Sequence, residues 1–206
     1  MNMPIETLAL AMTGASGAAY GLRLLELLLE YGINVQLMIS GAGQIVINQE
    51  TDLALPSSSE KQRDILLRKY PADSEQLQVF GTDQWFAPPA SGTGVADAMV
   101  VCPCTVGMVS AVACGASNNL MERAADVIIK EQKKLILVVR ETPFSAIHLE
   151  NMLKLARMSV SILPASPGFY YNATRVSDLV DFVVARILDQ LNIQHALIPA
   201  WGQDRL

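Results

Sequence analysis

The chain has 206 residues, a net charge of −5 at pH 7 and a sequence pI of about 5.0. This length fits one domain, and the acidic balance argues against a general nucleic-acid binder, which would carry a basic surface. Charged residues make up only 17% of the chain, against roughly 25% in an average soluble domain. We therefore expect part of the apolar surface to be buried between subunits.

The sequence also argues against a disulfide-rich, a metal-binding, a secreted and a membrane-spanning protein. The cysteines are few and clustered: Cys102, Cys104 and Cys114. They predict no disulfide framework, and with only two histidines the chain predicts no metal site. No basic region precedes the first apolar run, so we expect no signal peptide and a cytoplasmic protein. Ala98–Met121 carries no formal charge, but its proline, glycines and asparagines favour a buried strand and helix over a membrane span.

Apolar runs alternate with amphipathic stretches along the chain. In chain order, the predicted strands are Thr7–Thr13, Ile33–Ile39, Ala98–Cys102, Leu135–Val139 and Ser159–Leu163. The predicted helices are a leucine-rich one that Gly32 ends, then Gln44–Glu50, Glu60–Tyr70, Thr105–Cys114, Asn119–Glu131, Ser145–Met158 and Val176–Leu191. This alternation predicts a parallel sheet covered by helices on both faces.

The domain organisation is simple. We expect one domain over residues 1–206, with an insertion at 51–94 that ends in the loop-like stretch Pro88–Gly94, and a C-terminal tail at 193–206. Pro103 is expected to end the third strand, because proline cannot donate to a sheet ladder.

Candidate ligand-binding residues follow the strands, because ligands of parallel sheets bind beyond the carboxyl ends of the strands. Gly14–Gly17 forms a glycine turn before a helix, where backbone N–H groups and the helix dipole favour an anion. Its spacing is neither the dinucleotide fingerprint nor a Walker A loop. The turn therefore disfavours NAD and ATP and leaves open a mononucleotide phosphate or a tight turn without ligand.

Ser40 and Thr105 each stand at a predicted strand end. Their hydroxyls suit a phosphate or a ribityl chain, and helix capping is the alternative. The helix expected from Thr105 also offers the N–H groups of its first turn.

Arg140 and Glu141 follow a wholly apolar strand. Arginine binds phosphate with two parallel hydrogen bonds, and a glutamate there would suit acid–base chemistry; a structural salt bridge is the alternative. Cys102 and Cys104 have apolar neighbours and no base nearby in sequence, so we interpret them as buried apolar residues rather than nucleophiles.

Two helices and one loop add cations and aromatic rings. Arg123 and Lys130 are seven residues apart and share a helix face, which from the residues alone is best interpreted as a solvated surface. Arg186 falls on the apolar side of the last helix and either snorkels or presents a cation to a cleft. Tyr170 offers a phenol to an anion. Together these features favour a phosphorylated, partly apolar ligand.

Five segments carry a resemblance to a known family: T-G-A-S-G-A-A-Y-G-L-R-L-L, V-V-C-P-C-T-V-G-M, R-A-A-D-V-I-I-K-E, V-V-R-E-T-P and P-G-F-Y-Y. Through them the chain resembles the UbiX/Pad-type flavin prenyltransferases over Ala9–Leu191. The resemblance implies a flavodoxin-like, Rossmann-like three-layer α/β/α fold that binds FMN and assembles as a homododecamer.

The resemblance also implies a reaction. A dimethylallyl group passes from dimethylallyl monophosphate to N5 and then C6 of reduced FMN, without a metal. The prenylated FMN then serves a UbiD-type decarboxylase, often in ubiquinone biosynthesis. Two alternatives remain open. One is an FMN-dependent cysteine decarboxylase, although the histidine and the P-x-M-N loop typical of that class are missing; the other is a non-catalytic flavin-binding module.

The family's residue roles carry over by position. FMN would be held by Gly14, Ala15, Ser16, Ser40, Thr105, Val106, Gly107, Met108 and Arg140. The prenyl phosphate would be bound by Tyr170 and Arg186, with Arg123 and Lys130 contributed by a neighbouring subunit. Glu50 and Glu141 would handle protons, with Ser16 close to the reacting centre. Ser91 and Gly92 would flank the prenyl pocket, and Trp201 would close it.

Overall fold

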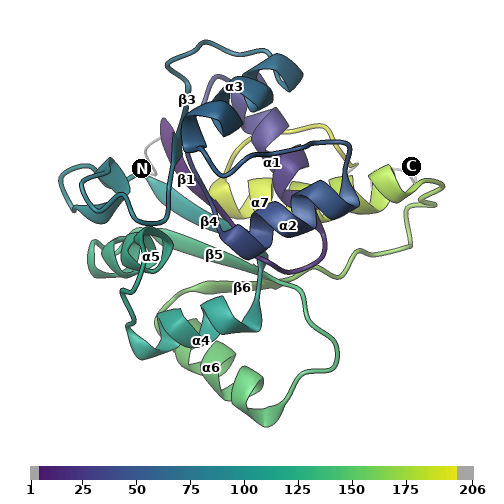
Figure 1. Ribbon diagram of the computed structural model, residues 1–206. Coiled ribbons are helices and arrows are strands. Elements are labelled where there is room, and N and C mark those ends of the chain that lie inside the picture. Colours follow the sequence, from purple (N-terminus) through teal and green to yellow (C-terminus); the bar gives the residue numbers. More distant parts are fainter. Residues whose placement is uncertain (1–4, 199–206) are drawn as a thin grey trace.

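A parallel six-stranded sheet forms the centre of the molecule in the computed structural model, which describes residues 5–198 (Figure 1). The strand order is β3-β2-β1-β4-β5-β6, and every neighbouring pair is parallel. The strands are β1 (Thr7–Met12), β2 (Asn34–Ile39), β3 (Leu77–Phe80), β4 (Ala98–Cys104), β5 (Lys134–Val139) and β6 (Ser161–Pro164).

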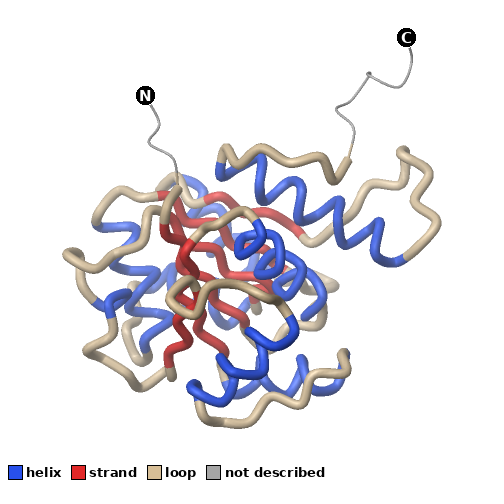
Figure 2. Tube along the Cα trace, turned by 90° about the horizontal axis from the view of Figure 1, so that it is seen from above, coloured by secondary structure: helices blue, strands red, loops and turns tan. Residues whose placement is uncertain are grey.

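Helices cover both faces of this sheet. They are α1 (Ala18–Glu30), α2 (Gly41–Glu50), α3 (Ser59–Lys69), α4 (Val106–Cys114), α5 (Leu120–Lys130), α6 (Ala146–Arg157) and α7 (Val176–Leu191), with a short 3-10 turn η1 (Pro88–Ala90). The core of one face contains residues of α1 and α7, and the core of the other contains residues of α4, α5 and α6. Figure 2 shows the strands as the central layer. The predicted three-layer α/β/α fold is confirmed.

Burial on both faces explains why the central strands are continuous apolar runs. Along β1, Leu8 and Leu10 enter one core cluster while Ala9 and Ala11 enter the other. Helix α1 lies so close to β4 that a Cβ atom on Gly21 would stand 2.3 Å from the carbonyl oxygen of Cys102. The glycine therefore permits the approach of helix and strand that places the turn after β1.

The prediction of five strands was wrong, because residues 51–94 supply a sixth. Strand β3 pairs with β2 at the edge of the sheet, and the guanidinium of Arg63 on α3 donates to the carbonyl of Leu77 in β3. Only four residues form β3, and of these only Leu77 is buried. Such a short, half-exposed edge strand leaves little apolar pattern in the sequence.

Pro103 does not end β4, which continues to Cys104 after a shift of register beyond Val101. The ring nitrogen cannot donate, but the carbonyl of Pro103 accepts the backbone N–H of Thr13 at 3.2 Å. The chain after β1 and β4 therefore stay hydrogen-bonded at Pro103, because its carbonyl oxygen is an acceptor even though its nitrogen is not a donor. Within residues 5–198, none of the helices has the length and apolar character needed to cross a bilayer.

Candidate active site

Thr13, which the sequence analysis did not single out, joins the ends of β1 and β4. Its hydroxyl donates to the carbonyl of Pro103 at 2.8 Å and accepts from the N–H of Thr105 at 2.9 Å, and the residue is 6% exposed. The turn after β1 and the start of α4 are therefore one hydrogen-bonded unit. No sequence signal marks this role, because a threonine after an apolar strand is common.

The first turns of α2 and α4 open at the same edge of the sheet. Ser40 caps α2 by accepting from Gly43 N–H at 2.9 Å, and Thr105 caps α4 by accepting from Met108 N–H at 3.1 Å. Capping, the alternative interpretation of both residues, is therefore confirmed. These bonds use the hydroxyl oxygens as acceptors, so each O–H can still donate to a ligand.

The first turns of α2 and α4 are not covered by other parts of the described chain near their glycines. A Cβ on Gly41 would meet nothing within 4 Å, and one on Gly107 would meet only the Thr105 hydroxyl, at 3.8 Å. The turn after β1 lies against α2, since a Cβ on Gly14 would stand 2.5 Å from that of Ala42. Each of these capped helix N-termini is therefore accessible at its first turn, where the backbone N–H groups are suited to a phosphate.

The N-terminus of α1 differs from the other two because a carboxylate of the protein occupies it. Glu50, the last residue of α2, accepts from the N–H groups of Gly17 and Ala18, both at 2.9 Å. Burial opposes ionisation of Glu50, but hydrogen bonds from Ser16 and these N–H groups, with the charge of Arg140, outweigh it and hold its pKa below the ordinary value. The dipole of α1 therefore stabilises Glu50 rather than an external anion.

This arrangement predicts a pH-dependent contribution of Glu50 to stability. Glu50→Gln keeps an oxygen that can accept from Gly17 and Ala18 but loses the negative charge at the N-terminus of α1, so it should lower the free energy of unfolding by about 0.5 kcal/mol at neutral pH. Because the folded pKa is depressed, the difference from wild type is full above the unfolded value of 4.5 and disappears as the pH falls through the folded pKa. Urea unfolding at a series of pH values measures it; a constant difference would contradict the prediction.

Arg140 and Glu141 follow β5 and reach the same edge. The N–H of Arg140 donates to the carbonyl of Cys104 and its Nε donates to the carbonyl of Ser16, both at 3.2 Å. Glu141 is half-buried, and one of its carboxylate oxygens accepts from Thr142 N–H at 3.1 Å. The structure thus brings Ser16 and Arg140 together at the sheet edge, as their strand-end positions predicted, and adds Glu50, which hydrogen-bonds with Ser16 and feels the charge of Arg140.

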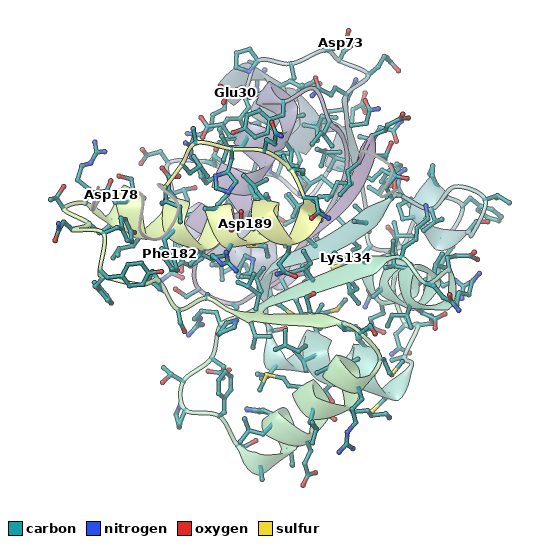
Figure 3. The ribbon with its side chains drawn as sticks, turned by 180° about the vertical axis from the view of Figure 1, so that it is seen from behind. Glu30, Asp73, Lys134, Asp178, Phe182 and Asp189 are labelled. Carbon is teal, nitrogen blue, oxygen red and sulfur yellow. The ribbon has the colours of Figure 1, made fainter. Side chains whose placement is uncertain are left out.

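Tyr170 and Arg186 lie on the side of β6 and α7. The loop after β6 starts beside the end of β5, because Ala165 N–H donates to the carbonyl of Val139. The ring of Tyr170 stands edge-on to that of Phe182, 5.9 Å away, and Arg186 is one helical turn further along α7. A groove of about 420 Å³ between β6 and α7 is lined by Phe182 and Arg186. Figure 3 shows Phe182 and Asp189 along this helix.

The second expected set of residues lies on the opposite face of the sheet. Arg123 donates to the carbonyl of Ala90 at 3.0 Å, and a Cβ on Gly92 would stand 3.2 Å from the ammonium of Lys130. Ser91 precedes Gly92 directly. This set belongs to α5 and η1 on the α4–α6 face, whereas Arg186 belongs to α7 on the other face (Figure 1). One chain therefore does not bring Arg123 and Lys130 together with Arg186.

Three other residues considered in the sequence are either buried or outside the described residues. Cys102 and Cys104 are buried, and burial raises the pKa of both thiols, so they are inert apolar residues as interpreted. Trp201 lies outside the described residues. Within residues 5–198, no three His, Cys, Asp or Glu side chains are grouped so as to hold a metal ion.

Comparisons with known proteins agree with this geometry. The flavoprotein family model matches residues 1–188. A flavin prenyltransferase UbiX of Pseudomonas aeruginosa is 54% identical over 201 residues, 98% of this chain and 96% of the relative. The solved dodecameric FMN-dependent UbiX-like decarboxylase of Escherichia coli O157:H7 is 36% identical with a TM-score of 0.84, covering 95% of this chain and 99% of that one. AnUbiX (PadA1), solved with FMN and dimethylallyl pyrophosphate, is 34% identical with a TM-score of 0.85, covering 96% and 98%. The chain belongs to the UbiX flavin prenyltransferase family of flavoproteins.

Proposed function

We propose that this protein is a flavin prenyltransferase that joins the dimethylallyl group of dimethylallyl monophosphate to reduced FMN. The observation that carries the proposal is the edge where the capped starts of α2 and α4 meet Ser16, Glu50 and Arg140. Relatives that match nearly the whole chain, at up to 54% identity, are named flavin prenyltransferases. The cysteine decarboxylase and the non-catalytic flavin module are therefore not favoured.

The residues at this edge fit FMN. Its phosphate suits the open N-terminal turns of α2 and α4, where Ser40 and Thr105 hold hydroxyl groups and the backbone N–H groups add positive charge. The FMN-binding set proposed is Gly14, Ala15, Ser16, Ser40, Thr105, Val106, Gly107, Met108 and Arg140. Reduced FMN, when bound, supplies the nucleophilic N5 and C6 atoms.

The charges of the chain suit cleavage of an allylic phosphate. As the C–O bond breaks, negative charge grows on the phosphate and positive charge on the prenyl carbon. Arg186 and Tyr170 bind the phosphate from α7 and its preceding loop, and Arg123 and Lys130 approach from the α5 face of a neighbouring subunit. Aromatic faces tolerate the prenyl cation, and Glu141 accepts a proton at its carboxylate.

Assembly and partners follow from the same proposal. The dodecameric relative supports a homo-oligomer, and apolar side chains of α6 stand exposed in a single chain: Ile147, Leu149 and Leu153. We expect a homododecamer in which such surfaces are covered. Delivery of prenylated FMN to a UbiD-type decarboxylase and a cytoplasmic location stay predictions.

The direct test weighs the flavin after reaction. The purified protein is incubated without oxygen and without metal with reduced FMN and dimethylallyl monophosphate, with dimethylallyl pyrophosphate in a parallel sample. Mass spectrometry should find a flavin heavier by one isoprenyl unit with the monophosphate. Bound but unmodified FMN with both donors would contradict the proposal, and product only with the pyrophosphate would correct the donor.

A further inference from the structure

His195 is a nearly buried imidazole that the proposed reaction does not use. It lies just beyond the end of α7, and its side chain is 8% exposed. The N–H of Leu197 donates to Nδ1 at 3.3 Å, so the proton of the neutral ring stands on Nε2. Nε2 faces the Oδ1 atom of Asp189 at 3.2 Å. The geometry therefore selects the tautomer that donates to Asp189.

Asp189 has a second partner, which is a residue of the proposed site. Its Oδ2 atom accepts from Nη1 of Arg186 at 2.5 Å. An exposed ion pair one turn apart on a helix contributes little and holds no fixed geometry by itself. Here the imidazole of His195 restrains the carboxylate from its other side. The guanidinium is thereby restrained through two successive hydrogen bonds.

Arg186 is one of the residues that line the groove between β6 and α7. The same groove is lined by Phe182, whose ring is packed against Tyr170, and by Ser166 of the loop after β6. An arginine that recognises a phosphate gains from a preset direction, because its donors lie in one plane. A freely moving guanidinium would have to be ordered by the ligand itself, at a cost in binding.

We propose that Asp189 and His195 are positioning residues that hold Arg186 in the β6–α7 groove for the phosphate of the prenyl donor. The inference rests on the proposed role of Arg186 in binding that phosphate. By this inference the segment after α7, which contains His195, contributes to substrate binding. Removing either positioning residue therefore weakens donor binding, although Asp189 carries a negative charge that by itself would repel the phosphate.

Four variants test this, with Asp181→Asn as the matched control. Asp181 lies on the same helix and pairs with Arg23 of α1 at 2.8 Å, away from Arg186. Asp189→Asn and His195→Phe should raise the KM for dimethylallyl monophosphate about tenfold. The value of kcat should fall by a smaller factor than the KM rises, because the guanidinium is still present, and the Kd of FMN should change less than about twofold. His195→Gln, whose amide can donate to Asp189, should restore the KM, and Asp181→Asn should keep it.

A second readout separates this inference from the proposed function. Calorimetry measures the Kd of dimethylallyl monophosphate on the FMN-loaded protein, so it needs no turnover. If the wild type binds the donor but forms no product, the proposed function fails and the Kd values still decide the inference. Unchanged Kd and KM in Asp189→Asn and His195→Phe, or tighter binding in Asp189→Asn, would overturn it. A lowered Tm with unchanged KM would show a structural role alone.

Discussion

Two variants that are each nearly inactive should restore activity to one another when they assemble together. Lys130→Ala removes a cation from α5, and Arg186→Ala removes one from α7. Each should lower kcat/KM for dimethylallyl monophosphate at least about 100-fold, because each cation stabilises the charge that grows on the departing phosphate. In a co-assembled mixture, about a quarter of sites should combine an intact α5 face with an intact α7 face from another chain.

The expected recovery follows from the layers of the fold. Lys130 stands on the α4–α6 face of the sheet, whereas Arg186 stands on the opposite face, and the buried central strands separate them. Within residues 5–198 of one protomer, the sheet therefore lies between these two cations. If both cations contact the same phosphate, they must therefore come from different subunits.

The control for this experiment is a pair of variants on the same helix. Lys130→Ala mixed with Arg123→Ala should show no recovery, because both positions lie on α5 of one subunit and every mixed site lacks at least one cation. Co-expression with two different affinity tags isolates the mixed assembly, and size-exclusion chromatography checks that it forms. Absence of recovery in an intact mixed assembly of the Lys130 and Arg186 variants would show that these two cations do not act on the same phosphate.

Most of the fold is readable from the sequence because its strands are buried on both faces. β1, β4 and β5 are apolar beyond their first residue, β2 is apolar except for Asn34 and Gln36, and each strand ends near a residue that starts the next helix. β3 escaped prediction because it is short and lies at the sheet edge, where one buried residue suffices. The prediction that Pro103 ends β4 failed for a different reason. Proline lacks a backbone N–H donor, but its carbonyl oxygen still accepts from Thr13, and the strand continues to Cys104.

The sequence predicts only those site residues that lie at the carboxyl ends of strands. Gly14, Ser40, Thr105 and Arg140 meet because parallel strands deliver their carboxyl ends to one edge. The contact of Glu50 with the start of α1 depends instead on where α2 ends, thirty-three residues beyond Gly17. The bridge made by Thr13 spans 92 residues, from the end of β1 to the residue after β4. Such long-range contacts produce no periodic pattern in the sequence, so they are found only in the structure.

The largest effect of a single charge is expected at Glu141. Glu141→Gln keeps the size of the side chain and its capacity to accept from Thr142 N–H, but an amide cannot take up a proton. Bond formation at a flavin nitrogen or carbon that carries hydrogen releases a proton, so losing the acceptor should slow turnover by roughly 10²–10⁴-fold. The Kd of FMN should stay close to that of the wild type, because Arg140, Ser40 and Thr105 are unchanged.

The measurement separates binding from turnover. Single-turnover formation of prenylated flavin is followed by mass spectrometry in Glu141→Gln and in Glu150→Gln, which replaces an exposed glutamate of α6. The Glu150 variant should react like the wild type. Full activity of Glu141→Gln would reject Glu141 as the proton acceptor, and would leave Glu50 and the departing phosphate as the bases near Ser16. Loss of FMN binding together with turnover would instead assign Glu141 to holding the cofactor, since a proton acceptor affects the rate and not the affinity.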